Sequence, residues 1–337
     1  MTTDSKLAAI RDRIDALDER IQDLVSERAT LAKEVATIKL AGDPDARFYR
    51  PEREAEILRR IKARNRGPLD GEEIARIFRE IMSACLALEK PLDIAFLGPE
   101  GTFTQAAALK HFGHSVRTKP QASIADVFRE VESRSCDYGV VPVENSTEGV
   151  VSHTLDMFLQ SPLRICGEVV LRIHHNLLGK TRDWRDAEIV YSHPQSLGQC
   201  RRWLEQNLPN ARREPVSSNA EAARIVRGKT GSVAIAGTEA ALLYGLEILC
   251  PSIEDEPGNT TRFLIIGSQD VAPSGADKTS LLLATRNVAG SLHRLLEPLA
   301  DHGISMTRIE SRPSRRGIWE YVFFICLLYT SPSPRDS

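Results

Sequence analysis

A long run of regularly spaced apolar residues near the N-terminus limits what this 337-residue chain can fold into. The apolar positions follow steps of three and four, at Leu7, Ile10, Ile14, Leu17, Ile21, Leu24, Leu31, Val35 and Ile38. This period predicts one amphipathic helix over residues 7–40, roughly 50 Å long at 1.5 Å per residue. Further helices are predicted over 52–65 and 67–89. Three helices of this size cannot cover so long an apolar face, so we expect a partner chain in an intertwined helical dimer.

The following segment, about 93–270, has the pattern of an α/β domain. Short apolar runs predict buried strands at 93–98, 137–143, 188–193, 232–237 and 261–267. Helical patterns separate them, at 104–112, 123–133, 195–206, 219–227 and 238–245. The length of the segment and its late final strand predict two α/β lobes with a cleft between them.

A polar linker then leads to a third pattern. Strand 279–286, helix 290–303, strand 304–313 and strand 318–325 follow one another. This order is βαββ, the first part of a βαββαβ ferredoxin-like module.

Charge and cysteine content exclude several classes of partner and site. With 44 basic and 46 acidic residues, the chain has no basic field that would attract nucleic acid or an anionic membrane. No window reaches the roughly 18 apolar residues of a membrane span, and the charged N-terminus does not resemble a signal peptide, so we expect a cytoplasmic protein. The six cysteines form no CxxC pair and no Cys/His spacing typical of zinc, so neither a metal site nor a disulfide framework is expected.

Several motifs occur together in one order: "IRDRIDALDERI", "GPEGTFTQAA", "GVVPVENSTEG", "SHPQSLGQC", "NTTRFLI", "GSLH" and "ESRP". Through them the chain resembles the bifunctional chorismate mutase / prephenate dehydratase family of phenylalanine biosynthesis, from residue 5 to about 325. The resemblance implies a multidomain fold: a three-helix, all-α mutase (1–90), a two-lobed, periplasmic-binding-protein-like α/β dehydratase (91–270) and an incomplete ferredoxin-like ACT regulatory domain (271–325). It also implies that chorismate is rearranged to prephenate, which is converted to phenylpyruvate without a cofactor.

The mutase reaction calls for cations rather than a nucleophile. Chorismate carries two carboxylates and rearranges in one unimolecular step, so its site must hold the carboxylates and donate a hydrogen bond to the ether oxygen. Arg28 and Lys39 are eleven residues apart, nearly three whole turns, and therefore share a helix face. The resemblance implies that Arg11 reaches the partner chain's site and that Glu52 is a site residue. Glu89 stands where some members have Gln, so we expect it to act as a neutral acid. A lone charged residue on such a helix is otherwise a solvated surface group.

The dehydratase reaction mainly requires a proton for the leaving hydroxyl, because formation of the benzene ring drives the loss of carbon dioxide and hydroxide. The resemblance identifies Thr261 of "TRF" as this proton donor. A threonine beside apolar strand residues otherwise serves as an ordinary β-branched strand residue. The residues expected to bind prephenate are Thr102, Asn145, Ser146, Ser192, Gln199, Arg262 and Phe263. Turn and capping hydrogen bonds are the alternative role for the polar ones.

Two motifs of the last segment resemble the effector site of an ACT domain, which in this family binds phenylalanine between subunits and inhibits the dehydratase. In "GSLH", backbone amides at a helix start would bind the amino acid carboxylate. The expected effector residues are Gly290, Ser291, Leu292, His293, Glu310, Ser311, Arg312 and Pro313. Turn and cap chemistry is the alternative for both motifs.

The chain ends on "FFICLLYTSPSPRDS", which departs from the family after Ile325. Its segment "CLLYTSPSPRD" resembles one reading frame of a transposon-end sequencing adaptor, so residues 326–337 are expected to be an artefactual tail. An ACT module without its second helix and fourth strand would leave strand 279–286 with an open apolar edge. We therefore expect weak or absent phenylalanine feedback.

Two other functions fit parts of the pattern. Two-lobed α/β domains and ACT modules also serve as non-catalytic amino-acid-binding sensors, and a fragment with chorismate mutase activity alone is a further alternative. The presence of Arg11, Arg28, Lys39, Glu52 and Thr261 favours the enzyme. A homodimer or higher homo-oligomer is expected, with chorismate and prephenate as substrates and phenylalanine as effector.

Overall fold

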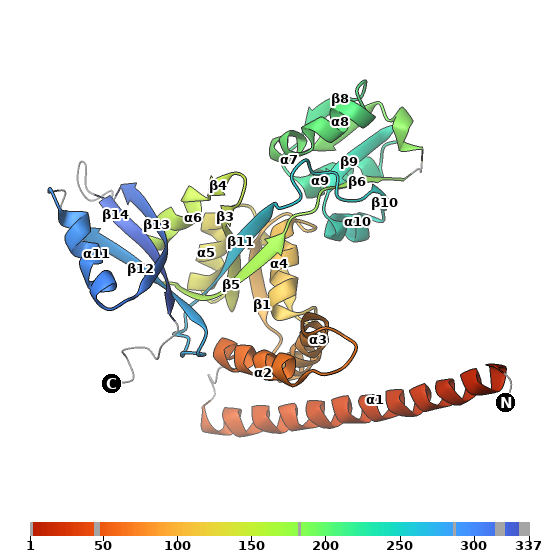
Figure 1. Ribbon diagram of the computed structural model, residues 1–337, viewed down its shortest axis with the longest axis horizontal. Coiled ribbons are helices and arrows are strands. Elements are labelled where there is room, and N and C mark those ends of the chain that lie inside the picture. The colour runs from red at the N-terminus through yellow and green to blue at the C-terminus, as the bar shows by residue number, and fades with distance from the viewer. Residues whose placement is uncertain (1–2, 44–47, 181–182, 286–287, 314–320, 330–337) are drawn as a thin grey trace. The chain divides into compact units, whose positions relative to one another are not determined.

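The computed structural model describes residues 3–43, 48–180, 183–285, 288–313 and 321–329. The chain divides into two compact units, one formed by residues 1–92 with 112–117, and the other by residues 93–111 with 118–337 (Figure 1). Within the described ranges, no helix has the length and apolar character needed to cross a membrane.

The first unit is helical, as predicted. Its helices are α1 (Thr3–Gly42), α2 (Pro51–Arg64) and α3 (Gly71–Glu89). Pro51 begins α2, and the Asp70 side chain accepts a hydrogen bond from the Glu73 backbone N–H, which caps α3. Both α1 and α2 pack against α3.

Most of the apolar stripe on α1 remains exposed within this chain. Ala36 is the only buried residue among the forty of this helix, whereas Leu24 is 62% and Ile38 is 72% exposed. An apolar face on a helix about 60 Å long is therefore left uncovered by the other two helices.

The second unit contains two α/β lobes, and this confirms the predicted α/β architecture. The first lobe has a sheet in the order β2-β1-β3-β11-β5, with the short β4 beside β3. The bounds of its elements are β1 (Asp93–Leu97), α4 (Phe103–Phe112), β2 (Arg117–Gln121), α5 (Ile124–Glu132), β3 (Tyr138–Asn145), β4 (Gly149–Val150), α6 (Ser152–Phe158), β5 (Arg164–Arg172) and β11 (Thr260–Gly267). The late strand β11 runs antiparallel between β3 and β5.

The second lobe has a sheet in the order β10-β6-β9-β7-β8. Its elements are β6 (Asn176–Gly179), a short 3₁₀ helix (Trp184–Asp186), β7 (Ile189–Ser192), α7 (Pro194–Gln199), α8 (Arg201–Asn207), β8 (Arg212–Pro215), α9 (Asn219–Arg227), β9 (Ser232–Ala236), α10 (Thr238–Tyr244) and β10 (Glu247–Cys250). The single helix predicted over 195–206 is divided in two, because the backbone of Cys200 leaves helical geometry at φ −112° and ψ 16°.

The chain passes between the two lobes twice. Residues 173–175 lead from β5 to β6, and residues 251–259 lead from β10 back to β11. These two crossing segments are hydrogen-bonded to each other: the Ile173 backbone N–H donates to the Asn259 carbonyl oxygen at 2.9 Å, and the Ile253 N–H donates to the His175 carbonyl oxygen at 2.7 Å. Side chains from both lobes therefore meet around one two-stranded connection.

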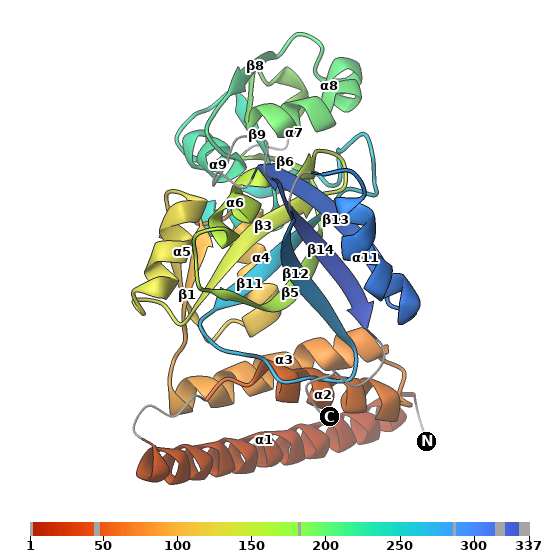
Figure 2. The ribbon, with the colours of Figure 1, turned by 90° about the vertical axis from the view of Figure 1, so that its left-hand side faces the viewer.

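The last module has the predicted βαββ order. It contains β12 (Asp277–Thr285), α11 (Ser291–Asp301), β13 (Ser305–Pro313) and β14 (Tyr321–Tyr329), with the sheet order β12-β14-β13 (Figure 2). Among the described strands β12 pairs only with β14, so the predicted open edge is present. The central strand continues beyond Ile325, since Cys326, Leu327 and Leu328 pair in register with β12. The predicted turn at 314–317 and residues 330–337 lie outside the described residues.

Ion pairs and an aromatic side chain join this module to the first lobe. Arg312 of β13 donates to both carboxylate oxygens of Asp156 in α6 at 2.7–2.9 Å. Arg308 of the same strand donates to Glu144 of β3 at 2.9 Å. Phe324 of β14 packs against the apolar core of the lobe.

Candidate functional site

The helical unit brings together three of the residues predicted to bind chorismate. Arg28 and Lys39 lie on the part-buried face of α1, and Glu89 is the last residue of α3. Both cations act electrostatically on the Glu89 carboxyl group. The Lys39 ammonium also lies 5.3 Å from the centre of the Phe48 ring. Two cations and one carboxyl group therefore face a common region beside α1.

The Glu89 carboxyl group has a raised pKa. Burial raises the pKa because it disfavours the charged form, and the positive charges of Lys39 and Arg28 oppose this effect without cancelling it. The protonated form therefore persists to higher pH than for an ordinary glutamate. In that form the carboxyl group can donate a hydrogen bond, as predicted for this position.

The other two predicted mutase residues come from other parts of the helical unit. Arg11 is exposed on the N-terminal half of α1. Glu52 lies in the first turn of α2, where its carboxylate accepts a hydrogen bond from the Arg50 guanidinium at 2.7 Å. Within this chain, no contact that the structure describes links Arg11 to Arg28, Lys39 or Glu89.

In the second unit, Thr261 lies next to the Asn145 side chain. Thr261 is the second residue of β11 and is 9% exposed, and Asn145 ends the neighbouring strand β3. The Asn145 amide donates to the Thr261 hydroxyl oxygen at 2.8 Å. Among the described residues, the Thr261 hydroxyl is bonded only as an acceptor, so its own proton remains available for a ligand.

The Asn145 amide has one possible orientation. Its carbonyl oxygen accepts hydrogen bonds from the backbone N–H groups of Thr147 and Glu148, both at 3.0 Å. Its NH₂ group must therefore face Thr261 and the side chain of Asn259, whose carbonyl oxygen accepts at 2.8 Å. A tight turn after β3 thus fixes the hydrogen bond to Thr261.

Gln199 joins the same network from the second lobe. It is the last residue of α7, and its carbonyl oxygen accepts from the Asn259 amide at 3.0 Å and lies 2.7 Å from His175 Nε2. The Gln199 NH₂ group lies 3.3 Å from a carboxylate oxygen of Glu148. Asn145, Gln199 and Thr261, predicted separately from three motifs, are therefore brought together at the connection between the lobes.

Arg262 and Phe263 have partners elsewhere. The Arg262 guanidinium donates to Glu144 of β3 at 2.8 Å and to Glu168 of β5 at 2.5 Å, so its described contacts tie the sheet together. Phe263 is 2% exposed within the sheet. A role for either residue in binding prephenate stays a prediction.

The remaining polar residues predicted to bind prephenate make local hydrogen bonds. Ser192 is fully buried in the second lobe, with its hydroxyl oxygen 2.9 Å from both the Ile235 carbonyl oxygen and the Asn219 amide oxygen. The Ser146 hydroxyl accepts from the Thr260 backbone N–H at 2.9 Å, and the Thr102 hydroxyl donates to the Leu97 carbonyl oxygen at 3.2 Å. These contacts match the turn and capping roles named as alternatives.

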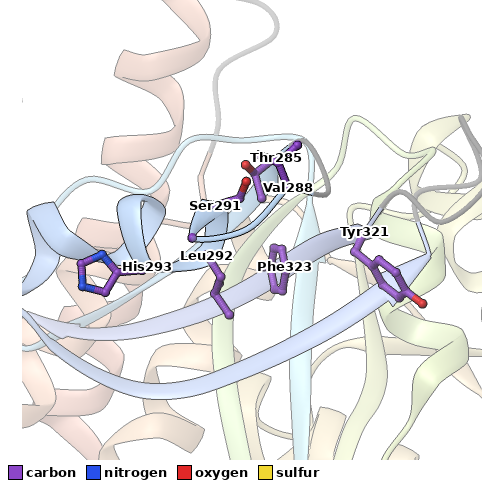
Figure 3. Close-up of a pocket in the computed structure, with 8 residues that line it drawn as sticks. Thr285, Val288, Ser291, Leu292, His293, Tyr321 and Phe323 are labelled. Carbon is purple, nitrogen blue, oxygen red and sulfur yellow. The ribbon is translucent and has the colours of Figure 1, made fainter.

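The first of the two predicted effector motifs lines a pocket in the last module. The pocket lies at the start of α11 and is lined there by the residues of the motif, Gly290, Ser291, Leu292 and His293 (Figure 3). Its aromatic lining comes from β14, with Tyr321 and Phe323. This pocket is not lined by the second predicted motif, Glu310, Ser311, Arg312 and Pro313. Instead they lie in β13, where Ser311 is paired with Phe323 in the register of the sheet.

Two residues of the lobe network, His175 and Asn259, were not predicted. Asn259 could have been found, because it directly precedes the strand that contains Thr261, and extended backbone continued to Asn259 would point both side chains to the same side. His175 gave no usable signal, since its partners are more than twenty residues away in sequence. Among the described residues, no cluster of three or more His, Cys, Asp or Glu could hold a metal ion.

Three family profiles match the chain in sequence. The profile described as chorismate mutase type II matches residues 10–90, prephenate dehydratase matches 94–271, and the ACT domain matches 279–328. These ranges contain, in turn, the Arg28–Lys39–Glu89 cluster, the Thr261 network and the pocket of the last module.

Known proteins with similar sequences and folds point the same way. The bifunctional chorismate mutase/prephenate dehydratase of Stutzerimonas stutzeri is 60% identical over 329 residues, covering 96% of this chain and 90% of that protein. The crystal structure of prephenate dehydratase from Arthrobacter aurescens in complex with L-Phe is 32% identical, with a TM-score of 0.65 over 71% of this chain and 80% of that one.

A related fold also occurs in a protein with a different activity. A structure described as a novel type of quorum quenching acylase is 30% identical, with a TM-score of 0.64 over 72% of this chain and 89% of that one. The fold alone therefore does not fix the chemistry. The assignment rests on the match of all three domains, in order, to relatives covered over nine-tenths of their length. The chain belongs to the bifunctional chorismate mutase/prephenate dehydratase family.

Proposed function

We propose that Arg28, Lys39 and Glu89 carry out the mutase step and that Thr261 is the proton donor of the dehydratase step. The chain is a chorismate mutase and a prephenate dehydratase of phenylalanine biosynthesis. The hydrogen bond from Asn145 to the Thr261 oxygen supports the assignment most strongly, because it leaves the hydroxyl proton for the substrate. We infer a cytoplasmic enzyme, since its substrates are soluble metabolites.

In the mutase step, the two cations bind the two carboxylates of chorismate. The neutral Glu89 carboxyl group donates to the ether oxygen as the carbon–oxygen bond breaks. Glu52 and Arg11 complete the site, and Arg11 does so from the partner subunit.

In the dehydratase step, Thr261 gives its proton to the ring hydroxyl of prephenate, which leaves as water. The ring carboxylate departs as carbon dioxide, and its bonding electrons complete the aromatic ring. The Thr261 oxygen then regains a proton from solvent. The hydrogen bond from Asn145 stabilises negative charge on that oxygen during the transfer. The Gln199 amide, which faces the same region, binds the substrate.

A coupled assay on the purified chain tests this function against the sensor alternative. Chorismate loss and phenylpyruvate formation are followed in one sample. We expect both, with prephenate as the intermediate. Binding of phenylalanine without either reaction would favour a sensor, and chorismate loss that stops at prephenate would favour a fragment with mutase activity alone.

The mutase rate should rise toward acidic pH. The raised pKa of Glu89 keeps part of the population protonated above the usual range of glutamate, and that share falls as the pH rises through the raised pKa. Because the protonated form is the active one, the rate falls with it. Glu89→Gln, which donates at every pH, should flatten the profile between about pH 5 and 8.

A second glutamate provides the control for this profile. Burial raises the pKa of Glu54 in α2 to about 7, against the opposing charge of Arg79. If protonation of Glu89 causes the pH dependence, the mutase rate of Glu54→Gln should still rise toward acidic pH. A wild-type mutase rate that does not change with pH, or a profile flattened by Glu54→Gln alone, would contradict the role of Glu89.

We further propose that the enzyme is a homodimer in which α1 helices cross between subunits. The exposed apolar stripe on α1 and the distance of Arg11 from its own cluster along the helix support this arrangement. Arg11→Ala and Lys39→Ala should each abolish most mutase activity. Co-expressed, they form heterodimers in which one site is intact, so about one quarter of the wild-type activity should return. No recovery would show that Arg11 acts within its own subunit.

The pocket at the start of α11 is the proposed phenylalanine site. Backbone N–H groups of the first turn suit the carboxylate of the amino acid, and Leu292 and Phe323 suit its ring. Glu310, Ser311, Arg312 and Pro313 are proposed to approach the effector from the other subunit. Calorimetric titration with phenylalanine should give binding to the wild-type chain that Phe323→Ala weakens, whereas equal binding by both proteins would place the effector elsewhere.

A further inference from the structure

His175 lies in the first crossing segment and has no role in the mechanism above. It is 2% exposed and adjoins the ring of Phe103, with ring centres 5.7 Å apart. Its backbone N–H donates to Glu254 at 2.9 Å, so the second crossing segment holds the residue in place. Its Nε2 lies 2.7 Å from the Gln199 amide oxygen, whereas its buried Nδ1 has no hydrogen-bond partner among the described residues.

A series of hydrogen bonds runs from Asn145 through Asn259 and Gln199 to His175, and the donor and acceptor of each bond can be assigned in only one way. The backbone N–H groups of the turn after β3 occupy the Asn145 oxygen, so the Asn145 NH₂ group faces the Asn259 oxygen. The Asn259 NH₂ group then has to face the Gln199 oxygen. Because that oxygen is an acceptor, His175 must carry a proton on Nε2.

Charge on His175 is disfavoured. Burial lowers its pKa by penalising the imidazolium, an effect that the hydrogen bond to Gln199 and the charge of Glu254 oppose only in part. The ring is therefore neutral near pH 7. With the proton fixed on Nε2, the bare Nδ1 lone pair is the buried atom without a partner.

We propose that His175 is a positioning residue for the dehydratase: as the neutral Nε2–H tautomer, it ends a chain of oriented amides, Gln199, Asn259 and Asn145, that holds the Thr261 hydroxyl ready to donate. This series of hydrogen bonds includes Gln199 of the second lobe, passes through the crossing segments and ends at Thr261 on β11 of the first lobe. The turn after β3 determines which way the Asn145 amide faces, and His175 holds the other end of the chain of hydrogen bonds. Loss of the His175 donor leaves the Gln199 oxygen with the Asn259 amide as its one described donor, so the Gln199 and Asn259 side chains can shift, and the hydrogen bond from Asn145 to Thr261 is held less firmly in place.

The tautomer can be measured in the unmodified protein. The full chain is labelled with ¹⁵N-histidine, and the ring nitrogen shifts are recorded at pH 7, with His175→Gln used to identify the signal among the eight histidines. We expect a neutral Nε2–H ring. An Nδ1–H tautomer or an imidazolium would overturn the proposal, whatever the role of Thr261.

Kinetics test the connection to Thr261, on whose proposed role this inference rests. His175→Leu removes the donor and should lower the dehydratase kcat about 10-fold with little change in KM, as for loss of one well-placed hydrogen bond. His175→Gln, whose amide can reach the same position, should remain within about twofold of wild type. His174→Leu is the matched control. His174 is the neighbouring histidine and bonds to Glu254 rather than to Gln199, so its replacement should leave kcat nearly unchanged.

A double substitution separates this role from a structural one. In a Thr261→Val background, His175→Leu should cause no further loss, because the positioned hydroxyl is already absent. An equal loss in both backgrounds, or an equal loss with Gln and Leu, would overturn the positioning role. If Thr261→Val alone retained the wild-type rate, the assignment of Thr261 would fail, while the tautomer would remain a separate result. An unchanged thermal unfolding curve in each variant verifies that the second unit, which contains His175 and Thr261, is folded.

Discussion

Replacing Thr261 by valine is expected to lower the dehydratase kcat by about 10²–10⁴-fold, the usual contribution of a positioned proton donor. Valine preserves the branched shape and the strand position, so the change removes only the hydroxyl group. The Asn145 amide that donates to this oxygen would then lose a partner at 2.8 Å. Steady-state rates of phenylpyruvate formation from added prephenate measure the loss.

Two further variants show whether the effect belongs to the hydroxyl itself. Thr261→Ser keeps a donor and should retain a large part of the activity. Thr260→Val removes the neighbouring hydroxyl from the same strand, and should leave the rate close to wild type. A Thr261→Val enzyme that differs from wild type no more than Thr260→Val does would exclude Thr261 as the acid.

Replacing Lys39 by alanine is expected to produce the second large effect, a loss of about 10²–10³-fold in mutase kcat, comparable to the removal of one donor from a preorganised anion site. The Lys39 charge acts on the same region as that of Arg28, as their shared effect on Glu89 shows. Without Lys39, one substrate carboxylate has no partner of opposite charge. Chorismate consumption at saturating substrate measures the change.

A lysine elsewhere on the same helix supplies the matched control. Lys33 is exposed on α1, and Lys33→Ala removes an equal charge that is not among those acting on the pKa of Glu89. Its mutase rate should stay within about twofold of wild type, because exposed charges interact weakly through water. Equal losses in the two variants would mean that Lys39 contributes only to the overall charge of the helix.

The helices and the central strands could be predicted because their signals are local. The spacing of apolar residues predicted α1 to within a few residues at each end. The third helix was predicted from residue 67, whereas α3 begins at Gly71, after the capping residue Asp70. The pairing of Arg28 with Lys39 could also be predicted, because the two residues share a face whenever the segment is helical.

The connection between the lobes could not be predicted to the same degree. Its hydrogen bonds join residues far apart in sequence, as from Asn145 to Asn259 or from His175 to Gln199. Neither periodicity nor propensity encodes such pairings. Several edge strands were also missed, among them the four-residue strands β8 and β10 and the nine-residue strand β5.

The last strand, β14, is longer than its own sequence pattern predicted, because it is paired with a neighbouring strand. The apolar run was expected to end at Ile325, yet the backbone continues as β14 to Tyr329. The neighbouring strand β12 begins at Asp277 and offers partners for these extra residues. Strand length is thus set by the pairing strand as well as by the residues of the strand itself.

The central claim is that one chain carries two separate sites, with the mutase in the helical unit and the dehydratase at Thr261. Mixing the purified Lys39→Ala and Thr261→Val proteins tests it most directly. Each protein alone should form little phenylpyruvate from chorismate, whereas the mixture should form it after a lag, as prephenate passes from one protein to the other. A mixture no more active than its components, or a single variant with wild-type overall activity, would contradict the claim.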